Sequence, residues 1–515
     1  MKTYPMKELT CLCLVLLSFS TKGQNIFQRT IGHNGTEYAF MVKPTDDGGT
    51  ILVGETTSFG SGGTDVYVVR TDNNANILWT KTYGGSDADH GYDIIQSADN
   101  GFIIIGDTKS FGNGKTDMYI LKIDSAGNTS WARTVGGSGD DGAGTIKYLS
   151  GGYYLVTGTI ESASPQEPNI ALVTISETGV VTNLQTISGL GLGWAASATF
   201  DQGHVISGFT SSSGAGGLDI CLVKFNPGGG IAWAKTYGGA KDDIAYGMQQ
   251  TLDGGYIVSG FTQSFGSLGW NNYLLKTDAT GNLLWSKVFT GSNNDRARHV
   301  IQTQDSGYLL AGYGPNAGNL IKTNSSGSIE WSKSFIQGSA LFSVTETLNG
   351  YFAAGGITDN TGSSDVYLLK LNKSGTSGCQ ESTISLTTSD PSSVVSTFSP
   401  GFQLSSVNSV PANVDTNSGG IMKTICLNGV GVHTIDNMKP PVLLYPNPGY
   451  GIYTIVRCPN CYVEVYDGVG KIVFDAVSED VRNEIDIRSF ANGVYFYRIK
   501  DLATGYTSNG KLIKN

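Results

Sequence analysis

Trp233-Ala234-Lys235 is one copy of a short motif, a tryptophan followed two positions later by a basic residue. The other copies are Trp79-Thr80-Lys81, Trp131-Ala132-Arg133, Trp285-Ser286-Lys287 and Trp331-Ser332-Lys333. Phe27 and Leu184 fill the two remaining places, so seven copies follow one another at intervals of about 50 residues. A unit of that length cannot bury its apolar face alone, and the sequence therefore predicts an array in which each copy packs against its neighbours.

Each copy contains four segments that suit β-strands. An alternating segment such as 245–251 comes first, the second strand follows a tight turn, the third follows an aspartate as at 117–122, and the fourth carries the tryptophan. The tight turns need positive φ angles, which the glycine or asparagine of Asp99-Asn100-Gly101 and Asp253-Gly254-Gly255 tolerates. Four antiparallel strands make one blade, and seven blades predict a closed β-propeller, an all-β fold that removes exposed sheet edges.

The order of these signals also resembles a known family of repeats. W-x-K, Y-G-G, D-D, D-G-G, S-F-G and Y-L-L-K follow one another between Trp233 and Gly281. This order resembles the SBBP-type repeat of secreted bacterial proteins, and Gly260 with its preceding apolar strand resembles the kelch blade. The kelch resemblance implies that the tryptophan strand is the outermost of each blade. It also implies that residues 26–31 complete the last blade beside residues 365–371, within a propeller that spans residues 24–375.

Composition and charge limit the partners of the chain. The 515 residues include 71 glycines, only 15% are charged, and the formal net charge is −10, so a basic surface for nucleic acid is not expected. The one long apolar run, residues 9–19, follows Lys2 and Lys7 and is about half a bilayer crossing in length. We therefore expect a signal peptide over residues 1–23 and no transmembrane segment in the mature chain.

Acidic residues recur in the loop after the tryptophan strand, on the face that carries the longer loops. They are Asp87, Asp89, Asp140, Asp141, Asp242, Asp243 and Asp295. Converging carboxylates could hold Ca²⁺, the only cofactor that the sequence suggests. Alternatively, each aspartate closes an Asx-turn and the repetition has copied a structural device. The second interpretation is favoured because no copy has the ligand spacing of a calcium loop.

Two other features leave alternatives open. Phe59, Phe111 and Phe265 of the Ser-Phe-Gly loops could stack on sugars or plug the space between blades, and their regular spacing favours plugs. The sixth copy departs from the repeat at Asp295-Arg296-Ala297-Arg298-His299. Its acid, two guanidinium groups and imidazole could bind an anionic sugar or act as acid and base, whereas ordinary drift of the repeat is preferred.

The period stops after Lys373, and residues 376–440 indicate a Ser/Thr-rich connector. In an exported protein, Cys379 and Cys426 could form a disulfide that closes this segment. Cys458 and Cys461 form a lone C-x-x-C, for which a disulfide that clamps a turn is favoured over zinc. Cys221 is expected to be a buried thiol.

Residues 441–515 predict a compact β-sandwich of about seven strands. Its signature residues are Pro446, Asn447, Pro448, Gly451, Asp467, Gly470, Lys471, Gly493, Tyr495 and Lys511. Their order resembles the type A C-terminal sorting domain of the Bacteroidetes type IX (Por) secretion system. The resemblance implies a periplasmic intermediate, the type IX translocon and sorting machinery as partners, and a secreted or outer-membrane cell-surface location.

Together these features predict an exported binding or adhesion module with a glycan or protein ligand. A polysaccharide-active enzyme with a site at the propeller mouth, or a structural surface-layer component, is the alternative. The enzyme ranks second and the structural component third. Catalysis is less favoured than binding because no histidine stands beside a nucleophile in a recognisable motif.

Overall fold

The structure, a computed structural model, consists of β-strands joined by turns and loops. It describes residues 26–161, 169–188, 190, 195–291, 294–359, 361–404, 409–411, 415–417, 419–428, 443–445, 452–456, 461–468, 470–478, 482–502 and 507–514. No α-helix occurs in these ranges, so the predicted all-β class is confirmed. Within the same ranges, no helix is long and apolar enough to cross a membrane. The predicted signal peptide lies outside the described residues.

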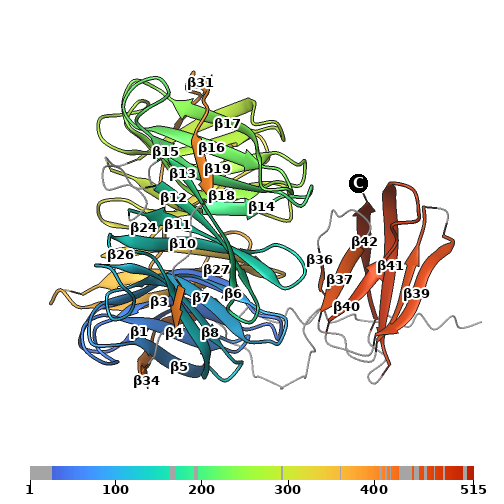
Figure 1. Cartoon of the computed structure of the whole chain (residues 1–515), viewed down its shortest axis with the longest axis horizontal. Coiled ribbons are helices and arrows are strands. Elements are labelled where there is room, and N and C mark those ends of the chain that lie inside the picture. The colour runs from blue at the N-terminus through green and yellow to red at the C-terminus, as the bar shows by residue number, and fades with distance from the viewer. Residues whose placement is uncertain are drawn as a thin grey trace, which may run out of the picture.

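Seven five-stranded antiparallel sheets form the larger part of the structure, called here the seven-sheet body (Figure 1). Strands are given from the innermost to the outermost. Sheet 1 contains β2 (Glu37–Pro44), β3 (Thr50–Thr56), β4 (Asp65–Thr71), β5 (Ile77–Gly84) and β34 (Asp415–Asn417). Sheet 2 contains β6 (Asp89–Gln96), β7 (Phe102–Thr108), β8 (Asp117–Ile123), β9 (Thr129–Val135) and β33 (Ser409–Pro411). Sheet 3 contains β10 (Asp141–Tyr148), β11 (Tyr153–Ile160), β12 (Asn169–Ser176), β13 (Val181–Ser188) and β32 (Gly401–Leu404).

The remaining four sheets follow the same plan. Sheet 4 contains β14 (Ala195–Ala198), β15 (His204–Thr210), β16 (Asp219–Phe225), β17 (Ile231–Gly238) and β31 (Val394–Thr397). Sheet 5 contains β18 (Asp243–Gln250), β19 (Tyr256–Thr262), β20 (Asn271–Thr277), β21 (Leu283–Thr290) and β30 (Thr387–Ser389). Sheet 6 contains β22 (Arg296–Gln302), β23 (Tyr308–Tyr313), β24 (Ala317–Thr323), β25 (Ile329–Gln337) and β29 (Ser382–Thr383). Sheet 7 contains β26 (Ser339–Thr347), β27 (Gly350–Thr358), β28 (Ser364–Leu371), β1 (Ile26–Gly32) and β35 (Ile421–Asn428).

The innermost strands of successive sheets contact one another. The contacts run from β2 through β6, β10, β14, β18 and β22 to β26, and β26 in turn contacts β2. Each sheet therefore packs between two neighbours, and apolar side chains of adjacent sheets share common clusters.

The tryptophan of the repeat joins one sheet to the next. Trp233 lies against Gly281, in the turn of the following sheet, where an added Cβ would come within 2.7 Å of the indole ring. Gly281 has a φ of +76°, and Asp278 holds the turn by accepting hydrogen bonds from the backbone of Thr280 and Asn282. The Tyr237 hydroxyl donates to the Gly281 carbonyl at 2.6 Å. Equivalent tryptophan–glycine pairs are Trp79 and Gly127, Trp131 and Gly179, Trp285 and Gly327, and Trp331 and Gly375.

Sheet 7 combines three separate parts of the chain. The N-terminal strand β1 pairs with β28, and its register places Phe27 opposite Lys370 and Ile31 opposite Val366. This is the pairing that the kelch resemblance implies. On its other edge β1 pairs with β35, which follows all seven sheets in the sequence.

The segment after the repeats lies against the outer edge of every sheet. We call residues 382–428 the belt. Its strands β29, β30, β31, β32, β33, β34 and β35 pair with sheets 6, 5, 4, 3, 2, 1 and 7 in that order. In Figure 1, β31 and β34 lie at the periphery against strands from early parts of the chain. The tryptophan strand is therefore the fourth of five strands, and the expectation that it would be outermost is wrong, because the belt supplies a further strand.

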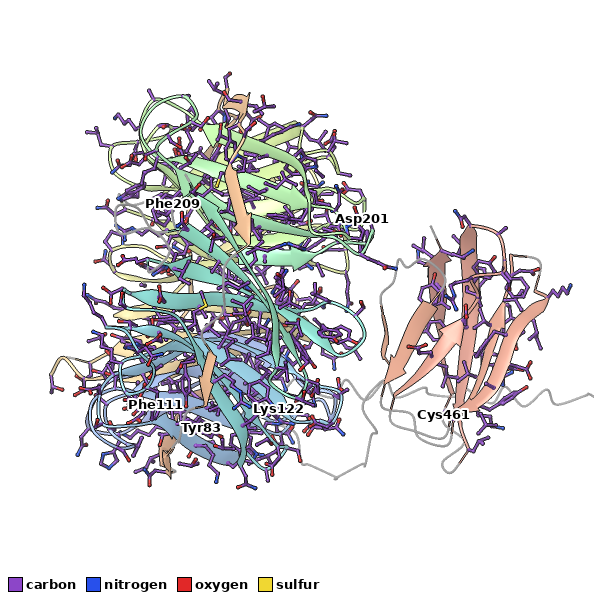
Figure 2. The ribbon with its side chains drawn as sticks, viewed as in Figure 1. Tyr83, Phe111, Lys122, Asp201, Phe209 and Cys461 are labelled. Atoms are coloured by element: carbon purple, nitrogen blue, oxygen red, sulfur yellow. The ribbon has the colours of Figure 1, made fainter. Side chains whose placement is uncertain are left out.

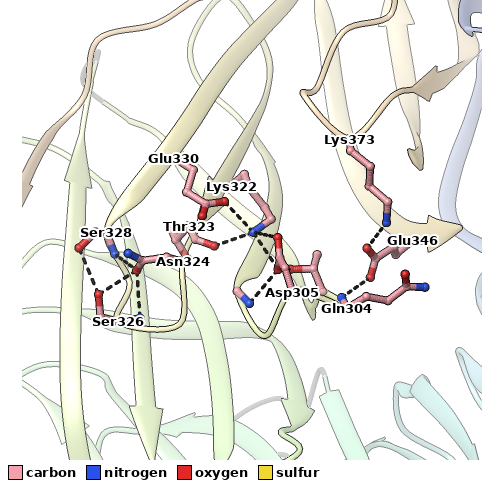
Figure 3. A network of polar contacts seen from close by, with 12 residues as sticks. Gln304, Asp305, Lys322, Thr323, Asn324, Ser326, Ser328, Glu330, Glu346 and Lys373 are labelled. Atoms are coloured by element: carbon pink, nitrogen blue, oxygen red, sulfur yellow. Dashed lines mark hydrogen bonds and ion pairs between the residues drawn. The ribbon is translucent and has the colours of Figure 1, made fainter. Parts of the chain in front are cut away.

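An ion pair between a buried cation and an exposed aspartate recurs beneath the tight turns of five sheets. Lys322 in β24 is 1% exposed, and its Nζ lies 2.9 Å from the Asp305 carboxylate and 3.0 Å from Glu330 (Figure 3). It also donates to the Thr323 carbonyl. The equivalent pairs are Arg70 and Asp47, Lys122 and Asp99, Lys224 and Asp201, and Lys276 and Asp253. The aspartate of the turn thus neutralises a cation from the third strand of its own sheet.

The C-terminal module contains two sheets that share one core. The first is formed by β36 (Leu443–Tyr445), β37 (Ile452–Val456) and β40 (Arg482–Asp486), and the second by β39 (Ile472–Ser478), β38 (Cys461–Tyr466), β41 (Gly493–Asp501) and β42 (Thr507–Lys514). Tyr453 and Ile485 of the first sheet pack with Val463 and Leu512 of the second. Figure 2 shows Cys461 at the start of β38 in this module.

The ion pair beneath the turns predicts a stability effect in sheet 5. Asp253→Asn should remove the negative charge that pairs with buried Lys276, which keeps its hydrogen bond to the Thr277 carbonyl, and should lower the free energy of unfolding. We expect a loss of about 2 kcal/mol, below the range for fully buried pairs, because Asp253 is itself exposed. Chemical denaturation checks the loss. Adding Lys276→Met should restore part of it, and Lys241→Met, an exposed lysine, is the control.

The same pair predicts a pH dependence. Burial raises the pKa of Asp253, but hydrogen bonds from Thr251 and Lys276 outweigh it, so the pKa is lowered overall. The stability that this carboxylate contributes is present above its unfolded pKa and is lost as pH falls through the folded pKa. The difference between wild type and Asp253→Asn should therefore shrink on acidification. A difference that stays constant would contradict this.

The ends of the belt predict a disulfide. Cys379 is disulfide-bonded, and the side chain of its expected partner, Cys426, lies outside the described residues. Gln28 donates from its side chain to the Cys379 carbonyl and is paired in register with Cys426. A Cys379–Cys426 bond would close the belt into a covalent loop around the seven sheets. Peptide mapping under non-reducing conditions should recover these two cysteines linked, and a link from Cys379 to Cys458 would contradict it.

Candidate functional site

A β-bulge in the innermost strands directs one side chain of each sheet toward the centre of the seven-sheet body. The register of the first two strands skips one residue in six of the sheets. The skipped residues are Phe40, Tyr92, Gly144, Tyr246, Arg298 and Phe342. In the fourth copy the equivalent residue is Trp194, which lies outside the described residues. The six skipped residues and Ala196 of β14 line one space, which we call the central cavity.

The central cavity has a volume of about 230 Å³ and is lined by residues from all seven innermost strands. Its shape follows from the residues at the bulge position. Sheets 7, 1, 2 and 5 place an aromatic ring there, and sheet 6 places an arginine. Sheet 3 has Gly144, which contributes no side chain at this level. We infer that the absence of a side chain at Gly144 leaves part of the cavity open.

Arg298 stands among aromatic rings. Its guanidinium carbon lies 4.1 Å from the centre of the Tyr246 ring, 5.7 Å from Tyr313 and 5.8 Å from Phe342. Phe40 continues this wall, with ring centres 5.6 Å from both Phe342 and Tyr92. The Arg298 Nε is buried and has no hydrogen-bond partner among the described residues. Cation–π contacts therefore position a guanidinium that has no ion-pair partner in the described part of the chain.

A charged cluster lies on the innermost strands β2, β6 and β10 and is formed by Lys43, Asp93 and Lys147. Buried Asp93 is 3.1 Å from Lys43 and 4.0 Å from Lys147, and it accepts hydrogen bonds from Thr145 and the backbone of Ile146. Burial raises the pKa of Asp93, but the two lysines outweigh it and hold the pKa at about 2. Burial and the charge of Lys43 lower the pKa of Lys147, which lines the cavity, to about 8.

His299 supports the backbone next to this cluster. Its Nδ1 accepts a hydrogen bond from the Val344 amide at 3.3 Å. Burial, followed by the charges of Lys43 and Lys147, lowers the pKa of His299 to about 3. The ring is therefore neutral near neutral pH, with its proton on Nε2, and is a poor candidate for a base or an acid.

A second titratable network lies beside Tyr92. The Tyr92 hydroxyl donates to Asp107 at 2.7 Å, and His90 Nδ1 lies 2.7 Å from the other oxygen of the same carboxylate. Glu55 is 3.7 Å from His90 Nε2. Burial lowers the pKa of His90, but Asp107 and then Glu55 outweigh it, so the pKa is raised. Burial raises the pKa of Glu55.

The recurrent aspartates of the long loops fall into two sets. Asp89, Asp141 and Asp243 are buried, and one oxygen of each accepts a hydrogen bond from the backbone amide four residues earlier. Asp87 and Asp140 are exposed and Asp242 is half-buried. The Asp87 backbone amide donates a hydrogen bond to the Ser110 hydroxyl, and the Asp242 carboxylate accepts one from the Leu218 amide. In the described residues, no group of three or more His, Cys, Asp or Glu side chains converges as a metal site requires.

The four residues singled out in the sixth copy are divided between different surroundings. Asp295 is buried and accepts from the Gly291 amide. Arg296 lies over Phe261 and Trp270, at 5.3 and 5.8 Å. Arg298 and His299 line the central cavity. The structure therefore brings two of the four together at the cavity and places the other two elsewhere.

The Ser-Phe-Gly loops pack between sheets. An added Cβ on Gly85, at the junction of sheets 1 and 2, would meet Phe111, and one on Gly239 would meet Phe265. Phe59 contacts Tyr67 and His33. These contacts favour the interpretation as plugs. Cys221 is a buried free thiol, and burial raises its pKa to about 12.

The sorting-signature residues that the structure describes are turn and strand residues. Asp467 accepts from the Lys471 amide across a turn in which Gly470 has a φ of +87°. Tyr495 is 5% exposed and donates to the Ala491 carbonyl. Gly493 begins β41, and Lys511 lies in β42 opposite Phe496. Pro446, Asn447, Pro448 and Gly451 lie outside the described residues, as does Cys458, whereas Cys461 is disulfide-bonded.

The sequence analysis missed most of the cavity. The signal that could have found it is the position after the small residue that follows the loop aspartate, as in Asp243-Ile244-Ala245-Tyr246. Aligned copies have Phe, Tyr, Gly, Trp, Tyr, Arg and Phe at this place, and the tryptophan of the fourth copy, Trp194, lies outside the described residues. The position varies more than the surrounding scaffold, and it faces the one space that all seven copies share.

The network beside Tyr92 predicts a measurable titration. Asp107→Asn should lower the pKa of His90, because it removes the largest of the contributions that raise it. In the wild type, the stability from protonated His90 is present below the unfolded pKa and is lost as pH rises through the folded pKa. NMR titration of the imidazole resonances checks the shift. Asp140→Asn, a change in an exposed loop, should leave the titration unchanged, and an unchanged pKa in Asp107→Asn would contradict the assignment.

Comparison with known proteins identifies one part of the chain. Residues 443–515 match the family described as secretion system C-terminal sorting domain. No curated protein matches. Among solved structures, the chain is similar to PorZ, an essential surface component of the type IX secretion system of Porphyromonas gingivalis, with 9% identity over 95% of this chain and 100% of that chain and a TM-score of 0.25. It is also similar to a BSP domain of a biofilm-associated protein, with 10% identity over 94% of this chain and 97% of that chain and a TM-score of 0.15. The C-terminal match identifies the chain as a substrate of type IX secretion, destined for the cell surface or the extracellular space.

Proposed function

We propose that the chain is an exported seven-bladed β-propeller that acts at the cell surface as a binding module, with its ligand in the central cavity. The propeller is supported by the succession of contacts from β2 through β26 and back to β2, and by the pairing of β1 with β28. The C-terminal module delivers this propeller through the type IX machinery and takes no part in ligand binding.

The observation that carries the proposal is the central cavity itself, with Gly144 at a bulge position where four other copies place Phe or Tyr and one places Arg. A ring at the position of Gly144 would fill part of this space. Concave sites with aromatic walls and a few polar groups are typical of ligand binding.

Binding is favoured over catalysis by the placement of the groups that could do chemistry. His299 is neutral and its Nδ1 is occupied by the Val344 amide. Asp295 accepts a hydrogen bond from its own loop, away from the residues that line the cavity. General acid and base catalysis needs two titratable groups that share one substrate, and these two do not.

Filling the cavity should abolish binding. Gly144→Phe imitates the ring that other copies carry at the same position, so the strand should accept it. A glycan array probed with the mature chain should show a saturable signal for the wild type and at least about tenfold weaker binding for this variant. Val180→Phe, at an exposed site, is the control.

The same array tests the acidic loops. Repeating it with a chelator separates calcium-dependent binding at Asp242 and Asp243 from binding in the cavity. A signal that survives cavity filling but disappears with the chelator would place the ligand on the loops instead. A blank array from the folded wild type would contradict a glycan ligand.

A further inference from the structure

We propose that the central cavity selects a ring that bears one carboxylate, which pairs with Arg298 while the ring packs on the aromatic wall. This inference rests on the proposed function, because it names the chemical class of the ligand that the cavity takes. It concerns neither the sorting module nor the acidic loops.

The charge of the cavity is opposite to that of the chain. The full sequence has a formal net charge of −10. The residues that line the cavity include Arg298 and Lys147 and no aspartate or glutamate. A cationic pocket in an acidic protein raises the local concentration of anions and disfavours cations. The ligand that fits this field carries negative charge.

Arg298 is the group that can pair with this charge. The ion pairs of the described residues engage Lys43 and Lys147 with Asp93, whereas none of them includes Arg298. Its Nε is buried without a hydrogen-bond partner, a costly arrangement for a guanidinium unless a ligand supplies an acceptor. Tyr246, Tyr313 and Phe342 surround the guanidinium and fix its position before the ligand arrives.

A carboxylate fits this single guanidinium better than a phosphate does. The planar fork of arginine matches the two oxygens of a carboxylate with two parallel hydrogen bonds. A phosphate monoester carries close to two negative charges near neutral pH and would need a second free cation. The other cation of the lining, Lys147, lies 4.0 Å from Asp93 and is already partly neutralised by it.

The aromatic wall and the volume indicate one ring. The centres of the Tyr92, Phe40 and Phe342 rings follow one another at 5.6 Å and continue to Arg298 and Tyr246. The lining also includes Gly144 and Ala196, and Gly144 lacks the ring that four other copies carry at its position. A volume of about 230 Å³ lies below the range of about 300–1,000 Å³ for drug-sized ligands. It suits a single ring with its substituents.

Two sources could supply such a ring, an acidic sugar unit of a polysaccharide or a free aromatic acid. Isothermal titration calorimetry on the mature chain distinguishes them with two matched pairs of probes. One pair is galacturonate and galactose, and the other is 4-hydroxybenzoate and phenol. At least one acid should bind about tenfold or more tightly than its neutral counterpart, because the charged hydrogen bonds to Arg298 are absent in the latter.

Variants of Arg298 and Arg296 test which arginine pairs with the carboxylate of the ligand. Arg298→Met keeps an unbranched side chain against the rings and should abolish the preference for the acid. Arg296→Met removes another arginine of the same strand, one that stacks on Phe261 and Trp270 and does not line the cavity, and should leave the preference unchanged. Thermal unfolding of both variants shows whether they fold, and the comparison of probes on the wild type does not depend on either of them.

Each outcome separates this inference from the proposed function. Equal binding of acid and neutral counterpart that is lost in Gly144→Phe would overturn the carboxylate and keep the cavity as the site. A preference for the acid that persists in Arg298→Met would overturn the role of Arg298. Absence of binding by both acids at millimolar concentration would overturn the ligand class, whatever a glycan array shows.

Discussion

The contact between the tryptophan of one sheet and a glycine of the next determines how the seven-sheet body is assembled. The indole ring lies so close to the turn that a side chain would clash, and the same glycine needs a positive φ angle. The turn of Gly281 is held in shape by Asp278 and receives a hydrogen bond from Tyr237 of the neighbouring sheet, and Tyr83 donates in the same way to Gly127. Every sheet therefore depends on the next for the packing of its fourth strand.

Because these contacts lie toward the outside, the inner strands are free to differ. The bulge in the innermost strand turns one side chain per sheet into the central cavity, and no contact of the scaffold requires a particular residue there. Phe40, Tyr92, Tyr246 and Phe342 make a wall, Arg298 adds a charge, and Gly144 leaves space. The scaffold repeats and the cavity does not, which is the arrangement expected when one architecture carries a specific site.

Much of this fold could be predicted from the sequence, because strands and turns are encoded locally. The Asp-x-Gly turns predict hairpins, and the structure gives Gly48, Asn100 and Gly254 positive φ angles. The belt could not be predicted, because its strands are only two to eight residues long and have no turn signals of their own. The cavity was also missed, because which side chains face inward depends on a register shift that appears only when two strands pair. Arg298 and His299 were singled out because they break the repeat, although their different roles depend on contacts with Tyr246 and Val344.

The belt connects the body to the part of the chain that directs its export. Sheet 7 contains β26–β28, the N-terminal strand β1 and the last belt strand β35, so it is complete only when residues from both ends of the body have met. Contacts of such large sequence separation form late because the loop entropy must be overcome first. The strand that completes sheet 7 is also the element that precedes the sorting module in the sequence. At eight residues β35 is the longest of the belt strands, and it pairs with all seven residues of β1.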